Sequence, residues 1–220
     1  MSSFVLKIIA LISMLLDHSG YVIFNGFSSF NLLGRFAFPL FAFQLTEGYT
    51  HTKSFKKYIF RLFLFAIISE IPFLLFKLKF VENAFALNIF FTLLLGLITI
   101  WIYDKNKILG SCFLLFAATI AEFLKFDYGA FGISIIFIFF VFKNNKLLMN
   151  LFFILAVIIK YLYNILIYFN TVYFYIYILL CIFTIFPIIF INLYNGKEGK
   201  KIKYLLYIFY PLHLIILYLL

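Results

Sequence analysis

Long apolar segments, separated by short polar or basic turns, run along the whole chain. At about 20 residues for each crossing of a bilayer, the pattern predicts nine membrane-spanning helices, of which the sixth is short. The predicted segments are residues 4–24, 30–49, 58–78, 84–103, 108–125, 128–143, 147–169, 172–194 and 202–220. Internal repeats and low-complexity linkers are not visible in the sequence. We therefore predict an all-α polytopic transmembrane helical bundle that forms a single domain over residues 1–220.

The composition agrees with this pattern. Hydrophobic residues make up 66% of the 220 residues, only 12% are charged, and the mean hydropathy is +1.14. A soluble domain is closer to half apolar and a quarter charged, so the composition indicates an integral membrane protein whose immediate partner is the lipid bilayer. The net charge is +10, but the basic residues lie between apolar segments, so we predict no nucleic-acid partner.

The basic residues also predict an orientation. Positive charge concentrates in the cytoplasmic loops of membrane proteins, and here it concentrates in alternate loops. One set of loops has only Lys77, Lys79 and Lys125. The other set contains Lys53, Lys56, Lys57, Lys105, Lys107, Lys143, Lys146, Lys197, Lys200, Lys201 and Lys203. We expect the second set to be cytoplasmic. The N-terminus is then cytoplasmic, and we expect a multi-pass protein of the cell membrane.

Five ionisable residues lie in or beside the first two predicted spans: Lys7, Asp17, His18, Arg35 and Glu47. A charge in the hydrocarbon region costs a few kcal/mol or more, so such residues are functional candidates. The two spans are antiparallel neighbours with a rise of about 1.5 Å per residue. This geometry predicts two ion pairs, Asp17 with Arg35 in the outer half and Lys7 with Glu47 near the cytoplasmic face. We also expect Pro39 to kink the second span.

Further polar positions interrupt the later spans and concentrate in the outer half of the membrane. We assign an outer substrate cavity to Asn88, Thr92, Glu122, Asp127, Tyr128, Lys160 and His213. Arg61 and Glu70 lie in the third span. The three histidines show no spacing typical of metal ligands, so we predict no metal.

His18 is the candidate general base, because imidazole titrates near neutrality. Adjacent residues on a helix point about 100° apart, so we do not expect Asp17 to hydrogen-bond the His18 ring directly. Glu70, Asn88 and Glu122 are the alternatives for orienting it. An Asp-His pair alone is equally compatible with a histidine that only packs between helices. Lys7 and His18 are eleven residues apart, which places them on one helix face about 16 Å apart.

The sequence resembles the TraX family of bacterial membrane proteins. The segments that carry this resemblance extend over most of the chain. They are Leu6–Ala10 with Asp17–Gly20, Gly34–Phe43 with Glu47 and Gly48, Arg61 with Phe65 and Ala66, Ser69–Phe73, Asn88 with Phe91–Leu93, Asp127–Gly129 and Tyr210–His213.

The TraX resemblance implies an acetyltransferase of the kind that acetylates the N-terminal amine of conjugative pilin. The spacing of Lys7 and His18 is also similar to the first span of integral-membrane acyltransferases that modify envelope sugars. In those proteins the basic residue is usually Arg. Lys7 differs from that pattern, since Lys lacks the planar guanidinium that binds phosphate through two hydrogen bonds.

These observations together predict an N- or O-acetyltransferase. Acetyl-CoA would be its cytoplasmic co-substrate, and a pilin-like peptide N-terminus or an envelope polymer would be the acceptor. The expected catalytic residues are His18, Asp17, Arg35 and Glu70, and the expected donor-binding residues are Lys7, Glu47, Arg61 and Lys57. A transporter that uses the same charges as a proton or substrate relay is the alternative. A structural membrane subunit with a stabilising polar network is the third possibility.

Overall fold

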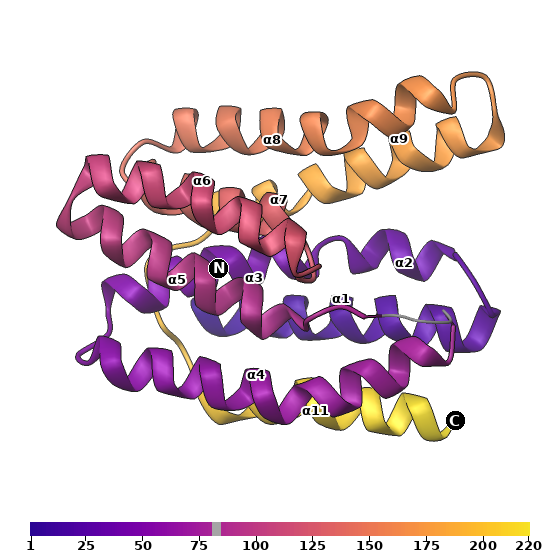
Figure 1. The fold of residues 1–220 in the computed structure, drawn as a ribbon, viewed down its shortest axis with the longest axis horizontal. Coiled ribbons are helices and arrows are strands. Elements are labelled where there is room, and N and C mark those ends of the chain that lie inside the picture. The colour runs from indigo at the N-terminus through magenta and orange to yellow at the C-terminus, as the bar shows by residue number, and fades with distance from the viewer. Residues whose placement is uncertain (81–84) are drawn as a thin grey trace. The chain divides into compact units, whose positions relative to one another are not determined.

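The structure is a computed structural model that describes residues 1–80 and 85–220 (Figure 1). Within those residues every extended regular element is a helix, and one isolated β-bridge joins Leu87 to Phe126. The predicted all-α fold class is therefore confirmed. The helices are α1 (Ser3–Phe24), α2 (Ser29–Gly34), α3 (Ala37–Thr50), α4 (Phe55–Leu78), α5 (Ile89–Lys105), α6 (Lys107–Phe123), α7 (Gly129–Val141), α8 (Lys146–Ile167), α9 (Val172–Ile185), α10 (Pro187–Asn192) and α11 (Lys203–Leu219).

Each apolar segment predicted from the sequence overlaps at least one of these helices over most of the helix. Polar residues in the turns set several of their N-termini. Asn106 and Asn145 accept hydrogen bonds from the backbone N–H groups of Leu109 and Leu148, which are unpaired in the first turn of a helix. The fourth predicted segment begins at residue 84, which lies outside the described residues, and its helix begins at Ile89.

Two of the predicted spans are interrupted. The second one, residues 30–49, consists of α2 and α3, with the break at Arg35 and Phe36. The interruption therefore precedes Pro39 and is not a kink at it. Pro39 lies in the first turn of α3, where a missing N–H costs nothing. The eighth predicted segment is divided into α9 and α10, and Pro187 begins α10.

The described chain forms two compact units. Unit 1 contains residues 1–41 and 141–201, and unit 2 contains residues 42–140 and 202–220. The single domain expected over residues 1–220 stays a prediction.

In unit 1, α1 packs along α2, α8 packs along α9, and α9 also contacts α2 (Figure 1). The start of the chain is bound to the segment that follows α10. Ser3 N–H donates to the carbonyl of Lys197 at 2.8 Å, and Phe4 N–H donates to that of Glu198 at 3.0 Å. These hydrogen bonds bring the N-terminus and the basic 195–201 segment to the same end of unit 1, which is compatible with the prediction that both are cytoplasmic.

In unit 2, α5 packs against both α4 and α6, and α11 packs along α4 (Figure 1). Helix α7 is apolar on all sides, and Ile133, Ile135, Ile136 and Phe139 are fully buried. Such a helix belongs in the interior of a protein or of a membrane. Gly96 of α5 lies directly against Ile136, and a Cβ atom at Gly96 would overlap the end of the Ile136 side chain, which would have to shift.

Within residues 1–80 and 85–220, four segments are long and apolar enough to cross a bilayer: α1, α4, α8, and Val172–Asn192, which contains α9 and α10. Helix α7 and residues Tyr204–Leu219 of α11 are shorter apolar helices. The chain is a membrane protein. The count of about nine spans and the cytoplasmic N-terminus stay predictions.

Candidate functional site

The candidate site in unit 1 is centred on the Asp17–Arg35 ion pair. Asp17 lies on α1, and Arg35 directly follows α2. One guanidinium nitrogen of Arg35, Nη2, donates to both carboxylate oxygens of Asp17, at 2.7 and 2.8 Å. The side chains are 12% and 21% exposed for Asp17 and Arg35, respectively. The ion pair predicted from residue depth therefore forms, and it is mostly buried.

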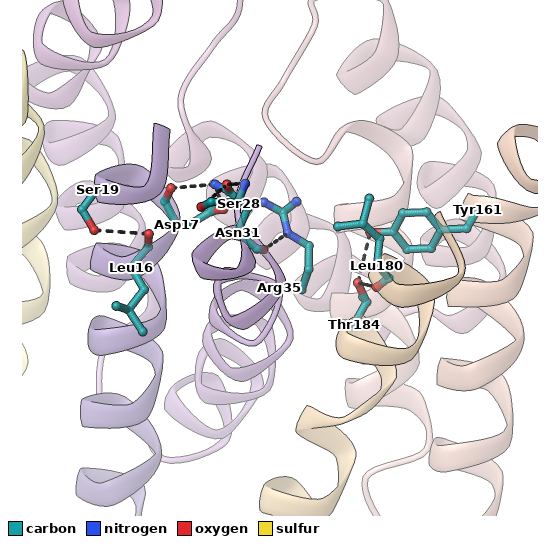
Figure 2. A network of polar contacts seen from close by, with 9 residues as sticks. All are labelled: Leu16, Asp17, Ser19, Ser28, Asn31, Arg35, Tyr161, Leu180 and Thr184. Atoms are coloured by element: carbon teal, nitrogen blue, oxygen red, sulfur yellow. Dashed lines mark hydrogen bonds and ion pairs between the residues drawn. The ribbon is translucent and has the colours of Figure 1, made fainter. Parts of the chain in front are cut away.

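Asn31 connects the two charged residues (Figure 2). It is fully buried on α2, and its amide Nδ2 donates to the backbone carbonyl of Asp17 at 2.8 Å and to Asp17 Oδ1 at 3.1 Å. Its own backbone carbonyl accepts from Arg35 Nε at 3.1 Å. The amide Oδ1 accepts from Ser28 N–H at 2.7 Å and from the Ser28 hydroxyl at 3.0 Å. Asn31 therefore holds Asp17, Arg35 and the start of α2 in one arrangement.

Two glycines allow α1 and α2 to approach closely enough for this network. A Cβ atom on Gly34 would overlap the Asp17 side chain. A Cβ atom on Gly20 would lie 2.8 Å from Ser28 Oγ and 3.2 Å from Asn31 Oδ1. Small residues at helix crossings are the usual means of close packing in membranes. The local sequence thus explains why α2 packs on α1 at the level of Asp17.

The network continues to α8 and α9 through Tyr161 and Thr184 (Figure 2). Both are buried, and their hydroxyl oxygens are 3.0 Å apart. The Thr184 hydroxyl donates to the carbonyl of Leu180 at 2.7 Å, so Tyr161 is the donor between the two. The Arg35 guanidinium interacts with the Tyr161 hydroxyl from the other side. Four helices of unit 1 therefore contribute to one polar network inside apolar surroundings.

His18 is half-buried on α1, next to Asp17. Its imidazole is within electrostatic range of both the Asp17 carboxylate and the Arg35 guanidinium. Asp17 directs its carboxylate at Arg35 and Asn31. The imidazole thus lies beside a fixed pair of opposite charges, where the position of each charge affects how readily the ring accepts a proton.

Lys7 lies on the same uninterrupted helix as His18, so the expected separation of about 16 Å applies to α1. Lys7 is half-buried and interacts electrostatically with Glu198. Glu47 belongs to unit 2, and its backbone carbonyl accepts from His51 N–H at 3.2 Å. Because the two residues lie in different units, the Lys7–Glu47 pair stays a prediction.

A second polar cluster lies in unit 2. Glu70 of α4 accepts two hydrogen bonds from Asn88, which precedes α5. The amide Nδ2 of Asn88 is 2.6 Å from Glu70 Oε2 and 2.7 Å from the carbonyl of Ala66. Asn88 Oδ1 accepts from Phe90 N–H at 2.9 Å and so caps α5. Two residues predicted for different roles, Glu70 and Asn88, thus form one buried contact between α4 and α5.

The connection between α6 and α7 involves four other predicted cavity residues: Thr92, Glu122, Asp127 and Tyr128. The Thr92 hydroxyl donates to the backbone carbonyl of Asp127. Glu122 Oε1 accepts from Ala130 N–H at 2.7 Å, so this exposed carboxylate caps the N-terminus of α7. Tyr128 has a positive φ of 66° at the turn. Since Glu70, Asn88 and Glu122 all have hydrogen-bond partners within unit 2, an orienting residue for His18 stays a prediction.

The remaining predicted residues are Lys57, Arg61, Lys160 and His213. Lys57 is exposed in the first turn of α4. The guanidinium of Arg61, one turn later, lies 5.6 Å from the ring centroid of Tyr58 and interacts with Tyr207. Lys160 Nζ is 6.0 Å from the centroid of Tyr161. His213 is buried. Its ring stacks on that of Phe209, and its Nδ1 is 2.8 Å from the backbone carbonyl of Phe209.

The structure adds Ser28, Asn31, Tyr161 and Thr184 to the residues expected from the sequence. Asn31 is an isolated polar residue within the second apolar segment, and this was a signal of the same kind that identified Arg35. Tyr161 and Thr184 gave no comparable signal, because tyrosine and threonine are common in apolar helices. In the described part of the chain, no three His, Cys, Asp or Glu side chains gather so that they could hold a metal ion.

Comparison with known proteins gives this arrangement a context. The sequence matches the family model described as TraX protein over residues 2–220. The chain belongs to the TraX family. A curated relative is the probable fimbrial assembly protein FimC, serogroup H1, of Dichelobacter nodosus. It is 32% identical over 145 residues, which cover 60% of this TraX-family chain and 59% of the relative. No solved structure matches the chain.

Proposed function

We propose that this TraX-family chain is an acetyltransferase of the bacterial cytoplasmic membrane, with about nine spans and a cytoplasmic N-terminus. Its donor is cytoplasmic acetyl-CoA, and its acceptor is an amine or hydroxyl of a pilin-like peptide or an envelope polymer at the outer side. Family membership supports the proposal, and so does the name of the relative, a fimbrial assembly protein. The observation that carries it is the position of His18 beside the buried Asp17–Arg35 pair.

In this proposal His18 is the general base. Its imidazole accepts the proton of the acceptor N–H or O–H while the acceptor atom forms its bond to the acetyl carbonyl carbon. The carbon–sulfur bond of the thioester breaks, and the proton is returned to the departing thiolate, so that the products are the acetylated acceptor and free CoA. Arg35 and Asp17 fix the charges next to the imidazole, and Asn31 fixes Asp17.

The start of α4 has a charge pattern that suits the phosphates of the donor. Lys56 and Lys57 are exposed in its first turn, which contains no acidic residue. Cations are unfavourable at the positive N-terminal end of a helix, and a bound phosphate would offset this repulsion. Arg61 follows one turn later on α4. In unit 1, the cation proposed to bind a donor phosphate is Lys7 on α1. When bound, acetyl-CoA would supply the acetyl group as a thioester.

The test is acetyl transfer by the full chain in lipid nanodiscs, with labelled acetyl-CoA and candidate peptide or polymer acceptors. His18→Ala should lower the transfer rate by about 10²- to 10⁴-fold, the usual contribution of a general base. His51→Ala is the matched control, because His51 is exposed at the end of α3. The transfer rate of His51→Ala should equal that of the parent chain. The thermal unfolding temperatures of both variants should stay close to that of the parent chain.

Transfer that persists in a folded His18→Ala variant would contradict the proposal. A buried ion pair between apolar helices is also a feature of membrane transporters, so the same nanodisc preparation should be compared with proteoliposomes. Solute or proton flux in the absence of any acyl donor, together with no transfer, would favour the transporter.

A further inference from the structure

Five lysines lie together at one end of unit 1. They belong to two segments of the chain, the start of α8 with the turn before it, and the segment that follows α10. The ammonium of Lys146 donates to the carbonyl of Asn192, the last residue of α10, at 3.3 Å. This contact places the two segments side by side. We call these lysines the basic end of unit 1; all are exposed, and they are Lys143, Lys146, Lys197, Lys200 and Lys201.

The segment after α10 follows a fixed path. Its backbone carbonyls at positions 197 and 198 accept from the N–H groups of Ser3 and Phe4, at 2.8 and 3.0 Å. Gly199 has a left-handed φ of 71° and packs closely on the start of the chain, since an added Cβ would lie 2.9 Å from the Cβ of Phe4. Lys197 and Lys200 therefore project from a backbone that is already held in place, which lowers the ordering cost of binding.

The charge of this end is strongly positive. Residues 142–146 and 193–201 contain five lysines and a single acidic residue, Glu198. The Glu198 carboxylate interacts electrostatically with Lys7 of α1 and lies 3.9 Å from Lys201 Nζ, where both side chains are largely exposed. An exposed pair of this kind is weak, so one carboxylate leaves most of the positive charge uncompensated. The basic end of unit 1 therefore attracts anions.

Exposed leucines lie directly beside these cations. Leu147 follows Lys146 and is 77% exposed, and Leu193 follows Asn192 and is 55% exposed. Both leucines are at ends of segments that are apolar enough to cross a bilayer. A soluble anion would contact only the lysines and leave the leucines in water. A phospholipid would use both features, because its phosphate meets the ammonium groups while its acyl chains cover the leucines.

We propose that the basic end of unit 1 binds an anionic phospholipid of the phosphatidylglycerol type. The headgroup phosphate accepts hydrogen bonds from the lysine ammonium groups, and the acyl chains lie along the start of α8 and the end of α10. Lys146 carries three ammonium N–H groups, so it can bind phosphate and keep its contact with Asn192. A zwitterionic phospholipid has no net charge to offset that of the lysines. The proposal goes beyond acetyl transfer and does not depend on it.

Native mass spectrometry of the full chain, released from a nonionic detergent, measures this binding without any acyl donor. Phosphatidylglycerol and phosphatidylcholine of equal acyl length are the two lipid ligands. The parent chain should bind phosphatidylglycerol about tenfold more tightly or better, and the difference should shrink as the ionic strength rises. Glycerophosphoglycerol, the same headgroup without acyl chains, is the third ligand. It should bind far more weakly than the lipid, because it leaves the leucines uncovered.

Two double variants with the same loss of charge test the location of the site. Lys197→Gln with Lys200→Gln should weaken phosphatidylglycerol binding roughly 25-fold, at about fivefold for each lysine, and should leave phosphatidylcholine binding unchanged. Lys105→Gln with Lys107→Gln is the control, because both residues are exposed lysines of unit 2. It should change phosphatidylglycerol binding by about twofold or less. Both variants should keep the unfolding temperature of the parent chain, since only exposed side chains are altered.

Equal affinity of the parent chain for the two lipids would overturn the proposal. Equal losses in the two double variants would also overturn it, because attraction to any exposed lysine would then explain the binding. If glycerophosphoglycerol binds as tightly as the lipid, the occupant is a soluble phosphate ester and the lipid proposal is wrong. If acetyl transfer fails while the preference for phosphatidylglycerol persists, the proposed function is wrong and the lipid site stands.

Discussion

Exchanging the side chains at positions 17 and 31 gives the double variant Asp17→Asn with Asn31→Asp. It tests whether the negative charge must be at position 17, next to His18, or whether any carboxylate that pairs with Arg35 is sufficient. Asp17→Asn removes a carboxylate held by contacts of 2.7 and 2.8 Å and leaves Arg35 unpaired. Removing one partner of a fully buried pair costs about 3–5 kcal/mol. The side chains here retain 12% and 21% exposure, so we expect a loss of about 2–3 kcal/mol in unfolding free energy.

Asn31→Asp should cost about 2 kcal/mol, because the carbonyl of Asp17 loses its donor and two carboxylates then share one guanidinium. In the double variant, the carboxylate introduced at position 31 still accepts from Ser28 and lies one helical turn from Arg35. The double variant should therefore be about 1–2 kcal/mol more stable than the sum of the single changes implies.

The assay is thermal unfolding of the four chains in one detergent. At about 2–4 °C per kcal/mol for a chain of this size, Asp17→Asn should lower the unfolding temperature by roughly 4–12 °C. Acetyl transfer should remain low in the double variant, since the negative charge has moved from the residue next to His18 to helix α2. Strict additivity of the two changes in stability would refute the network. Full recovery of transfer would show that the charge of Asp17 matters only through its pairing with Arg35.

Two further predictions concern packing and capping. Gly34→Ala should destabilise the chain by about 1–3 kcal/mol, because the added Cβ overlaps the Asp17 side chain. Gly26→Ala is the control and should be neutral in the same unfolding assay, because no atom lies within 4 Å of its added Cβ. Equal effects of the two variants would exclude close packing as the cause. Glu122→Ala should destabilise the first turn of α7 by about 1 kcal/mol, because it removes the cap on Ala130 N–H. Glu122→Gln should retain most of this stability, since its amide oxygen can still accept that hydrogen bond. Amide hydrogen exchange in the first turn of α7 measures both effects, and unchanged exchange in Glu122→Ala would contradict the capping role.

The Asp17–Arg35 pair shows how far sequence reasoning reached into the site. Charges in apolar segments are few, and antiparallel neighbours at a fixed rise bring only certain depths together. These two constraints were enough to pair Asp17 with Arg35. They were not enough to find Asn31, whose hydrogen bonds depend on the break after Gly34 that turns α2 onto α1.

Glu122 shows what the sequence leaves open. Its place in an outer cavity stays a prediction, and the structure shows an exposed carboxylate that accepts a hydrogen bond from the backbone N–H of Ala130. A carboxylate near a helix end satisfies unpaired N–H groups as readily as it lines a cavity. The sequence pattern around Glu122 is the same in both situations, so only the path of the α6–α7 connection separates them.

The order of residues was enough to show an all-α membrane protein of the TraX family, where its apolar helices lie, and which few charges they bury. Hydrophobic length and the cost of a buried charge are local properties, so they can be read along one chain. Three-dimensional packing was needed to show which uncharged polar groups complete the site: Asn31 between Asp17 and Arg35, and Tyr161 with Thr184 beyond them. Each of those contacts requires a donor and an acceptor on different helices to be placed to within an ångström of each other's ideal position. The periodicity of apolar residues along the chain does not contain that information.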